Sequence, residues 1–434
     1  MTSWRPWFHA LLSRYLGTHI PPASRVVVVG EDAVAGSGEE LQLPGAEIVR
    51  VPADGAADAV ASSRTDHVIL YGTVHRVTDI QLHLEALHRA MTSSTRLTLV
   101  FYSALWRPLL SLATRLGVRQ SDSAGNWVSP EDIANLLALS GFEQVRLERK
   151  VLLPLPLPGL SWLCNRLLAP LPLINALCLV NIVVARARKP SGDAPPSVSV
   201  VVPARNEAGN LQAILDRLPA MGPQDEVIFI EGHSTDGTWQ ALERLVRDHQ
   251  GRLPVRIARQ NGYGKGNAVR TGFAMANNDI LMILDADLTV PPEELPRFYR
   301  IIAEGRGEFI NGSRLVYPME ANAMQFANLV ANKGFALIFS FLLGQRFKDT
   351  LCGTKVIRRE HYRQIAANRG HFGDFDPFGD FDLLFGAAHL GLKIIEVPIH
   401  YRQRTYGTTN IQRWRHGLLL ARMVVFAARK LTFI

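Results

Sequence analysis

The sequence predicts an α/β protein with two domains. Three observations support this fold class: short aliphatic runs alternate with amphipathic segments between residues 24 and 150, the alternation resumes at residue 198, and a Pro/Ser-rich stretch, KPSGDAPPS, lies between them. Such alternation is typical of parallel sheets with crossover helices. We therefore expect a smaller doubly wound domain over residues 1–189, a linker over 190–197, a larger Rossmann-like domain over 198–410 and a basic amphipathic helix over 411–434.

The composition agrees with two globular domains and restricts the partners. The chain has 434 residues, of which 47% are hydrophobic and 20% charged. Its net charge of +8 is concentrated at the C-terminal end, because no Asp or Glu follows Glu396. This localised charge favours a phosphate-rich partner or an anionic membrane surface, and no nucleic-acid-binding module is recognised. The 3 cysteines lack metal-ligand spacing, which fits a reducing compartment. The N-terminal residues lack the pattern of a signal peptide, so we expect a cytoplasmic location.

In the first domain, aliphatic runs bounded by turn residues predict strands. The stretch Ile80 to Met91 predicts a helix, and Pro130 to Val145, PEDIANLLALSGFEQV, predicts a capped helix, a turn at Gly141 and another strand. The predicted strands before it cover residues 25–30, 46–51, 67–72 and 96–102.

Residues 151–185 are almost entirely apolar, and Arg166 is their one charged residue. Leu167 to Ala185 is just long enough to span a bilayer, but the prolines and two asparagines argue against a clean span. Three interpretations follow, in this order: a membrane-interfacial or re-entrant hairpin, a buried helix with the last strand of the first domain, and a spanning helix.

The second domain begins with three loops that follow predicted strands. The first strand leads into Pro203, and Asn206 is expected to cap a helix with an apolar stripe at Leu211, Ile214, Leu215 and Leu218. The second strand, residues 226–232, leads into STDGT at 234–238, which is expected to cap a helix over 239–247. After the third strand, glycines around Lys265 precede a helix, where backbone amides and a lysine favour phosphate. Each loop taken alone is equally a helix cap or a flexible turn.

The stretch DILMILDADLTVPP, residues 279–292, organises this domain. Its aliphatic run Ile280 to Leu284 predicts a strand buried on both faces of a parallel sheet. The strand ends in Asp285 and Asp287, which project to the same side because side chains alternate along an extended chain. Two such carboxylates suit a divalent cation that balances a diphosphate. The alternative is a pair of solvated turn acids before a helix.

With these motifs assembled, the second domain resembles the inverting GT-A glycosyltransferases of the polyprenol-phosphate sugar synthase (dolichol-phosphate mannose synthase-like) family. The resemblance rests on VVPARNE, IEGHSTDGT, GKGNAVRTG, DADLTVPPE, NGSR and EVPIHYRQRTYGTTN in this order. It implies that Asp285 and Asp287 hold Mg²⁺ or Mn²⁺. It also implies a nucleotide-sugar pocket formed by Pro203, Ala204, Arg205, Glu207, Glu231, Asp236, Gly264 and Lys265. Two departures are Glu231-Gly232, where the family has adjacent acids, and Thr289, where some relatives use a metal-binding amide.

The resemblance also suggests the residues for catalysis and for the acceptor. In HFGDFDPFGDFDLLF, residues 371–385, the second GDFD copy places Asp382, rather than Asp380, at the family's catalytic acid position. A metal loop or helix N-terminal charges are the alternatives. Arg314 and Arg404 favour a phosphate acceptor, which needs cations rather than a base, although either could clamp the donor diphosphate.

The outline of the first domain resembles the class I S-adenosylmethionine-dependent methyltransferase fold. Its first loop, residues 30–38, has glycines at the wrong spacing and acids where the cofactor carboxylate would lie, and its second strand ends in Arg50-Val51-Pro52 without an acid. We therefore expect a degenerate domain that neither binds S-adenosylmethionine nor transfers methyl groups.

Two further segments suggest membrane contact. Residues 323–347 are apolar with flanking cations, which suits an interfacial helix. In residues 411–434, Arg415, Arg422 and Arg429 recur every seven residues, which suits an interfacial helix with snorkelling arginines, although packing against the first domain is the alternative.

The sequence thus predicts a metal-dependent inverting glycosyltransferase. It would be a peripheral or monotopic protein that moves a sugar from a nucleotide-sugar to a polyprenyl phosphate at the cytoplasmic membrane face. The alternatives are transfer to a sugar hydroxyl in cell-envelope glycan assembly, a bifunctional methyltransferase and glycosyltransferase, and a first domain that is a non-catalytic scaffold. The base, the sugar, the prenyl length and the oligomeric state are left open.

Overall fold

The computed structural model describes residues 4–30, 41–115, 125–189, 192, 194–249, 251, 253–317, 326–369, 380–404, 406 and 413–433, with only the backbone of 326–328, 380–381, 413–417 and 430–431. The loop over 31–38, the first GDFD copy at 373–376 and the stretch 407–412 lie outside the described residues. The chain forms two compact units. The first comprises Met1–Lys189, His389–Gly391 and Val425–Ile434, and the second Pro190–Ala388 and Leu392–Val424.

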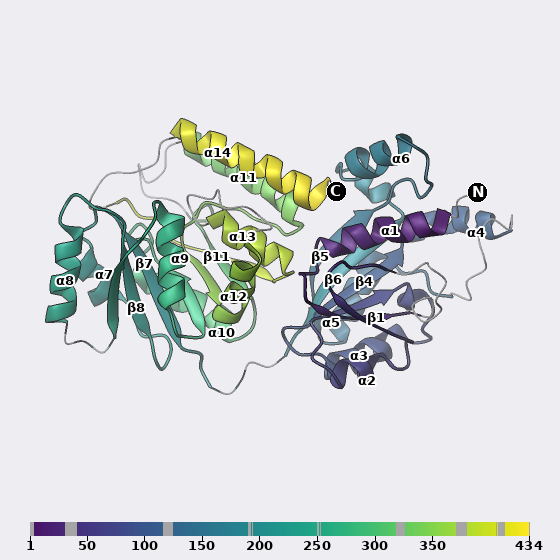
Figure 1. The fold of residues 1–434 in the computed structure, drawn as a ribbon, viewed down its shortest axis with the longest axis horizontal. Helices are drawn as coiled ribbons and strands as arrows, with labels where there is room; N and C mark the ends of the chain where they lie inside the picture. The colour runs from purple at the N-terminus through teal and green to yellow at the C-terminus, as the bar shows by residue number, and fades with distance from the viewer. Residues whose placement is uncertain are drawn as a thin grey trace. The chain divides into compact units, whose positions relative to one another are not determined.

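The first unit contains a six-stranded sheet in the order β2-β1-β3-β4-β6-β5 (Figure 1). Its strands are β1 (Arg25–Val29), β2 (Glu47–Val51), β3 (His67–Tyr71), β4 (Arg96–Tyr102), β5 (Phe142–Lys150) and β6 (Val180–Ala187). The first four run parallel, whereas β6 is antiparallel to both β4 and β5. The strands predicted before residue 103 are confirmed to within one residue.

Alternating side chains of this sheet face two cores. Val27 and Val29 pack with α2 (Ala56–Ala61), α3 (Ile80–Ala90) and α5 (Pro130–Leu139) on one face. Val26 and Val28 pack with α1 (Trp4–Gly17) on the other. The remaining helical segments are η2 (Thr73–His75), η3 (Ala104–Trp106), α4 (Arg107–Arg115), α6 (Leu160–Trp162), η4 (Leu163–Leu168) and η5 (Ile174–Leu177). The predicted helices at 80–91 and after Pro130 are confirmed.

The apolar segment 151–185 does not form a spanning helix, so the third interpretation is wrong. Its last six residues belong to β6, which is buried along its whole length, and the expectation of a last strand is confirmed there. The prolines divide the preceding part into short helical turns. None of the helices in the described part of the chain is long and apolar enough to cross a bilayer.

The second unit contains a seven-stranded sheet in the order β13-β11-β12-β10-β7-β8-β9. Its strands are β7 (Val198–Ala204), β8 (Glu226–Glu231), β9 (Val255–Arg259), β10 (Ile280–Ile283), β11 (Phe309–Ser313), β12 (Lys355–Arg358) and β13 (Ile394–Pro398). Its helices are α7 (Leu211–Arg217), α8 (Thr238–Asp248), α9 (Lys265–Met275), η6 (Pro292–Glu294), α10 (Leu295–Ala303), α11 (Phe326–Leu343), α12 (Arg359–Ala367) and α13 (Asp380–His389). Near the C-terminus, α14 (Arg413–Ala427) and η8 (Ala428–Thr432) follow.

Two local predictions for this unit need correction. The strand at 280–284 is fully buried, but only β7 runs parallel to it, because the four-residue β12 returns antiparallel on its other side. Asn206 does not cap a helix, since α7 begins only at Leu211. Asn206 instead has a positive φ of 56°, and its Oδ1 accepts a hydrogen bond from the Thr235 amide at 2.8 Å.

Candidate active site

Four parallel strands bring the predicted loops to one edge of the second sheet. β10, β7, β8 and β9 are neighbours with the same direction, so their carboxyl ends lie together. Helix α9, which follows the glycine-rich loop, crosses β7 so closely that a Cβ on Gly272 would overlap the Val201 side chain. Open α/β sheets bind ligands at this edge.

The paired aspartates follow β10 directly. Asp285 and Asp287 are partly exposed, whereas Ala286 between them is buried. The backbone amide and hydroxyl of Thr289 both donate to Asp287 Oδ1, at 3.1 and 2.7 Å. Leu288 between them has a φ of 56°, a conformation that L-residues seldom adopt. Thr289 therefore fixes the orientation of the second carboxylate.

A cation from a different loop faces each of these aspartates. Lys265 Nζ lies 2.5 Å from Asp285 Oδ1. Arg404 bridges two acids, because its Nη2 lies 2.7 Å from Asp287 Oδ2 and its Nη1 lies 3.0 Å from Glu207 Oε1. Burial opposes the ionisation of Asp285, but Lys265 outweighs it and holds the pKa of Asp285 below its ordinary value.

Glu207 differs from Asp285 in its affinity for a proton. Burial raises the pKa of Glu207 to about 7, against the opposing effects of Arg404 and Asn210. Asn210 Nδ2 donates to its Oε2 at 2.7 Å, and Arg404 donates to the other oxygen. At neutral pH the Glu207 carboxyl group is therefore partly protonated, whereas Asp285 is ionised.

Asp236 holds the first two loops together. It accepts hydrogen bonds from the Ala208 amide at 3.3 Å and from the Thr238 amide at 3.1 Å. Tyr406 also donates to it at 3.3 Å. Burial opposes ionisation, but the bonds from Thr238 and Ala208 hold the pKa of Asp236 below its ordinary value. The carboxylate thus fixes the rim of the predicted nucleotide pocket.

The other predicted pocket residues lie around the same strand ends. Glu231 is buried, accepts from the Ser234 amide at 2.5 Å and faces Arg259 at 3.8 Å. Pro203 and Ala204 end β7, Arg205 follows with its side chain exposed, and Gly264 precedes α9 with a φ of 85°.

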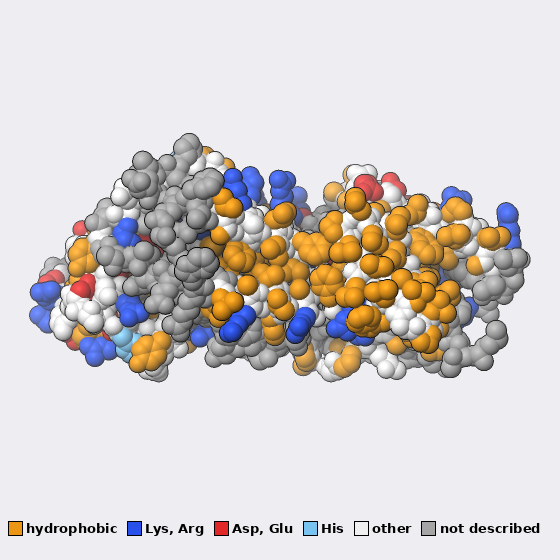
Figure 2. Space-filling model, turned by 90° about the horizontal axis from the view of Figure 1, so that it is seen from above, with side chains coloured by type: hydrophobic (Ala, Val, Ile, Leu, Met, Phe, Trp, Pro, Cys, Tyr) orange, Lys and Arg blue, Asp and Glu red, His pale blue; other side chains and the backbone are white. Residues whose placement is uncertain are grey.

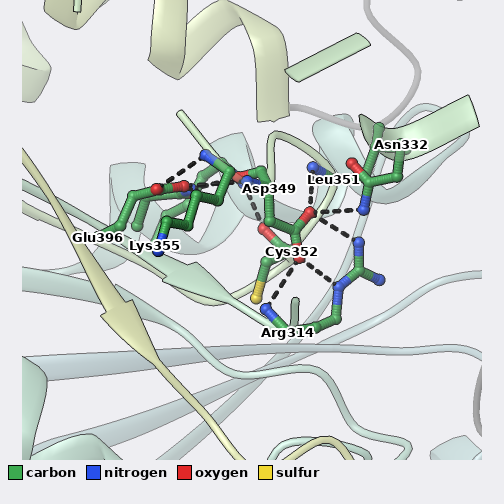
Figure 3. A network of polar contacts seen from close by, with 9 residues as sticks. Arg314, Asn332, Asp349, Leu351, Cys352, Lys355 and Glu396 are labelled. Carbon is green, nitrogen blue, oxygen red and sulfur yellow. Dashed lines mark hydrogen bonds and ion pairs between the residues drawn. The ribbon is translucent and has the colours of Figure 1, made fainter. Parts of the chain in front are cut away.

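Arg314 lies in a buried polar network (Figure 3). Its Nε and Nη2 donate to the two carboxylate oxygens of Asp349, at 2.7 and 2.9 Å, and its guanidinium lies 5.2 Å from the Tyr401 ring. Asn332 donates to the same carboxylate at 2.9 Å. Although burial disfavours both charges, each stabilises the other, so the pKa of Arg314 is raised and that of Asp349 is lowered to about 2.

The loop from Asp349 to Gly353 connects this network to the paired aspartates. At Gly353 a Cβ would overlap both Asp285 Oδ2 and Lys265 Nζ, so a larger residue here would displace this carboxylate and this ammonium. Cys352 beside it is fully buried, which with the nearby Asp349 raises the pKa of its thiol to about 12. The backbone of this loop therefore forms one wall of the site.

Asp382 belongs to a cluster with α12. Arg369 Nε donates to its Oδ2 at 2.9 Å, and Arg369 Nη2 donates to the Tyr362 hydroxyl at 3.4 Å. Tyr362 in turn packs edge-on against Phe273 of α9, with 4.8 Å between ring centroids. Of the doubled GDFD motif, only Asp382 has a described side chain.

The two aspartates fit a divalent cation chemically. Their carboxylate oxygens are the hard ligands that Mg²⁺ and Mn²⁺ prefer, and the glycine at 353 leaves Asp285 Oδ2 without a side chain above it. Among the described residues, no group of three or more His, Cys, Asp and Glu side chains is arranged to hold a metal.

Comparison with known proteins defines the class of the second unit. Residues 199–366 match the family model described as glycosyl transferase family 2. The second unit therefore carries a glycosyltransferase domain, and the prediction of a glycosyltransferase is confirmed for this domain.

The similar proteins are named as sugar transferases. A dolichol-phosphate mannosyltransferase of Pyrococcus furiosus is 28% identical over 222 residues, 50% of this chain and 59% of that protein. A dolichyl-phosphate hexose transferase of Haloferax volcanii is 29% identical over 52% of this chain and 92% of its own length. An undecaprenyl-phosphate 4-deoxy-4-formamido-L-arabinose transferase of Yersinia pestis is 33% identical over 50% and 63%. The chain thus spans less than two thirds of the first and third.

Among solved structures, a glucosyl-3-phosphoglycerate synthase from Mycobacterium tuberculosis in complex with Mn²⁺, UDP and glucosyl-3-phosphoglycerate is similar at a TM-score of 0.40. It is 19% identical, over 54% of this chain and 80% of that chain. Similarity at this level carries no information about the reaction.

Sequence reasoning missed three contributors to the site. Asp349 and Gly353 lie in DTLCGT, which matches no motif, and only the folded chain brings this loop to Asp285 and Arg314. The hydroxyl of Tyr406 reaches Asp236 across 170 residues of sequence.

Proposed function

We propose that this chain transfers a sugar from a nucleotide-sugar to a polyprenyl phosphate, with inversion, at the cytoplasmic face of a membrane. The observation that carries the proposal is the pairing of Asp285 with Lys265 and of Asp287 with Arg404 at the carboxyl edge of a glycosyltransferase sheet. The names of the three relatives support a prenyl-linked phosphate as acceptor.

Asp285 and Asp287 are the residues that would hold Mg²⁺ or Mn²⁺. Such an ion supplies positive charge to the donor diphosphate as the bond to the sugar breaks. Lys265 and Arg404 are long cationic side chains in contact with these carboxylates, and they can turn to the diphosphate oxygens when the donor binds. Glu207 retains Arg404 beside the site, and Asp236 with Thr238 keeps the nucleotide loop in place.

In the proposed reaction, an oxygen of the acceptor phosphate forms a bond to the anomeric carbon. The bond from that carbon to the diphosphate breaks, and the nucleoside diphosphate leaves with the electron pair. The acceptor phosphate is already ionised at neutral pH, so no base has to remove a proton. Asp382, held by Arg369, is proposed to orient the acceptor. Arg314 is paired with Asp349 and contacts the Tyr401 ring. We therefore propose that Arg314 influences acceptor binding indirectly, by positioning Tyr401 and the loop from Asp349 to Gly353.

Exposed apolar side chains on α11 and in the C-terminal helical segment support membrane contact. On α11, Val330, Leu337 and Phe341 are exposed and share one face of the helix. On α14 and the adjoining η8, the exposed residues Leu418, Arg422, Val425 and Arg429 form one stripe in which apolar and cationic side chains alternate. A stripe of this kind suits the membrane interface, where arginines reach the headgroups.

For the first unit we propose a methyltransferase-like fold without methyl transfer. The strand arrangement, with antiparallel β6 between β4 and β5, supports the resemblance in outline, while β2 ends without an acid. The binding of S-adenosylmethionine to the full chain is the test, and tight, saturable binding would contradict the proposal.

The proposed transfer is tested with a panel of nucleotide-sugars, each with and without a short, water-soluble prenyl phosphate. Nucleoside diphosphate release and prenyl-phosphate-linked sugar are both measured. We expect one donor to give both products, only when the prenyl phosphate and Mg²⁺ or Mn²⁺ are present. Transfer to a free sugar hydroxyl, with no product on the prenyl phosphate, would replace this proposal by the hydroxyl-acceptor alternative.

A further inference from the structure

The first unit exposes a large apolar surface, which we call the apolar cap and define as residues 104–115 and 155–177. Leucines and a tryptophan project from it into solvent: Leu109 is 58% exposed, Trp162 54% and Leu173 92%. Figure 2 shows hydrophobic side chains gathered over this part of the molecule, in its right half. Monomeric soluble proteins rarely expose so many contiguous large apolar side chains.

In the second segment of the cap, residues 155–177, Ser161 and Asn165 are buried while the large apolar side chains are exposed. Asn165 is buried, accepts hydrogen bonds from the Leu152 and Leu153 amides at 2.8 and 2.9 Å, and donates to the Leu153 carbonyl at 2.8 Å. Ser161 is also buried and accepts from the Leu157 amide at 2.8 Å. These side chains thus bond backbone groups of a proline-rich segment, while the leucines face outward.

Two segments distant in sequence form this one surface. Trp106 Nε1 donates to the Leu177 carbonyl at 2.8 Å and so joins η3 to the end of the second segment. Asn175 Nδ2 donates to the carbonyls of Ala169 and of Arg149 in β5, both at 2.9 Å. The exposed leucines are therefore fixed to the sheet, so the apolar surface is built into the fold of this unit.

The charges of the cap all have one sign. Arg107, Arg115 and Arg166 are its only charged residues, and the sequence from Arg149 to Gly192 contains no Asp or Glu. Arg107 and Arg115 are exposed at the two ends of α4. Apolar side chains with cations at the edge complement a surface in which apolar acyl chains lie below negatively charged headgroups.

We propose that the apolar cap inserts into the interface of an anionic lipid bilayer. Leu109, Trp162 and Leu173 would enter the boundary between headgroups and acyl chains, and Arg107 and Arg115 would contact lipid phosphates. The first unit is then a membrane-binding domain in its own right. This inference does not depend on the sugar-transfer reaction, because vesicle binding is measured without a donor.

The experiment is flotation of the full chain with vesicles of phosphatidylcholine, with and without phosphatidylglycerol. The variant L109E/L173E carries two acids in the cap. The matched control L82E/L139E carries the same changes at leucines that are 62% and 59% exposed on α3 and α5, which pack on the other face of the sheet. We expect the control to float like the wild type, and the cap variant to lose at least about tenfold in partitioning, because two leucines no longer leave water.

A second pair of variants tests the charge of the cap. R107Q/R115Q is expected to lose about thirtyfold in binding to phosphatidylglycerol vesicles and little on phosphatidylcholine alone, since each of the two cations contributes about 1 kcal/mol near an anionic surface. Circular dichroism and the urea midpoint check each fold, and the single change L173S, at a site 92% exposed, serves if the double variant unfolds.

Two outcomes would overturn the proposal. One is flotation of the cap variants at wild-type levels. The other is a wild-type dimer that L109E/L173E converts to monomer while neither protein binds vesicles, because the cap would then be an interface with a second copy. Failure of vesicle binding with intact transfer to the water-soluble prenyl phosphate would leave the proposed function standing.

Discussion

Two carboxylate–cation arrangements in the second unit have the same chemistry but different access to water. The side chains of Asp349 and Arg314 are 0% and 11% exposed, whereas those of Asp287 and Arg404 are 15% and 27% exposed. Asp349 also receives bonds from Asn332 and from the amides of Arg314 and Leu351, so its partners cannot easily be exchanged. Asp287 accepts hydrogen bonds from Thr289 and from Arg404. From this comparison we propose that the buried pair maintains the fold and that the accessible pairs can exchange partners with ligands.

The largest expected effect is on transfer, at the accessible pair. Asp287→Asn is expected to lower the transfer rate roughly a hundredfold or more, because it removes charge from the proposed metal and diphosphate site. The urea midpoint should change little. Glu293→Gln, at an acid that is 51% exposed and paired with Arg217, is the control and should transfer sugar normally. Unchanged turnover in Asp287→Asn would exclude the metal assignment.

At the buried pair, Asp349 and Arg314, a substitution should mainly lower stability. Asp349→Asn leaves the Arg314 guanidinium buried without its counter-charge, and we expect a loss of about 3 kcal/mol or more in the free energy of unfolding of the second unit. Urea unfolding measures the loss. Arg217→Gln breaks the exposed pair with Glu293 and should cost less than about 1 kcal/mol. Similar losses in both variants would show that burial does not distinguish the two kinds of pair.

Acid should weaken the buried pair within a defined pH window. The pKa of Asp349 is about 2 in the folded protein against an ordinary value of 3.8. The folded state therefore binds this proton less readily than the unfolded state, and the ionised carboxylate stabilises the fold above pH 3.8. This contribution, about 2 kcal/mol, is lost as the pH falls from 3.8 through 2. Urea midpoints at successive pH values should decline less steeply in Asp349→Asn than in the wild type, and parallel declines would contradict the assignment.

A smaller effect is expected at the bridging arginine. Arg404→Lys keeps the charge but cannot reach Glu207 and Asp287 at once with two nitrogens. We expect the KM for the nucleotide-sugar to rise about tenfold, with a smaller change in kcat. Arg402→Lys, two residues earlier and without a resolved pairing to these acids, is the matched control. Equal kinetics for the wild type and Arg404→Lys would rule out a role in donor binding.

Sequence patterns predicted the site best where the candidate functional residues come directly after a strand. The aliphatic run before Asp285, the glycines around Lys265 and the apolar stripe of α7 each reflect local physics, and the structure has them as expected. Most strands of both sheets follow from the same local patterns. The antiparallel strand β6 was harder to predict, because the apolar residues 151–179 that precede it would equally suit a membrane-associated segment.

Long-range pairing was out of reach of sequence reasoning. The bond between Arg314 and Asp349 joins residues 35 positions apart, and that between Arg404 and Glu207 joins residues 197 apart. No periodicity encodes such contacts, since they depend on the order of strands in the sheet. The antiparallel return of β12 delivers both Asp349 and Gly353 to the site, and its four residues give almost no pattern.

The contact made by Gly353 limits how this protein can be redesigned. Mutant libraries that aim to alter donor choice would naturally include the residues nearest the paired aspartates. At position 353 every replacement would place a carbon where an oxygen of Asp285 and the Lys265 ammonium already lie, so it would displace the pair on which the proposed reaction depends. Libraries aimed at new specificity should therefore vary exposed pocket residues such as Arg205 and leave position 353 unchanged.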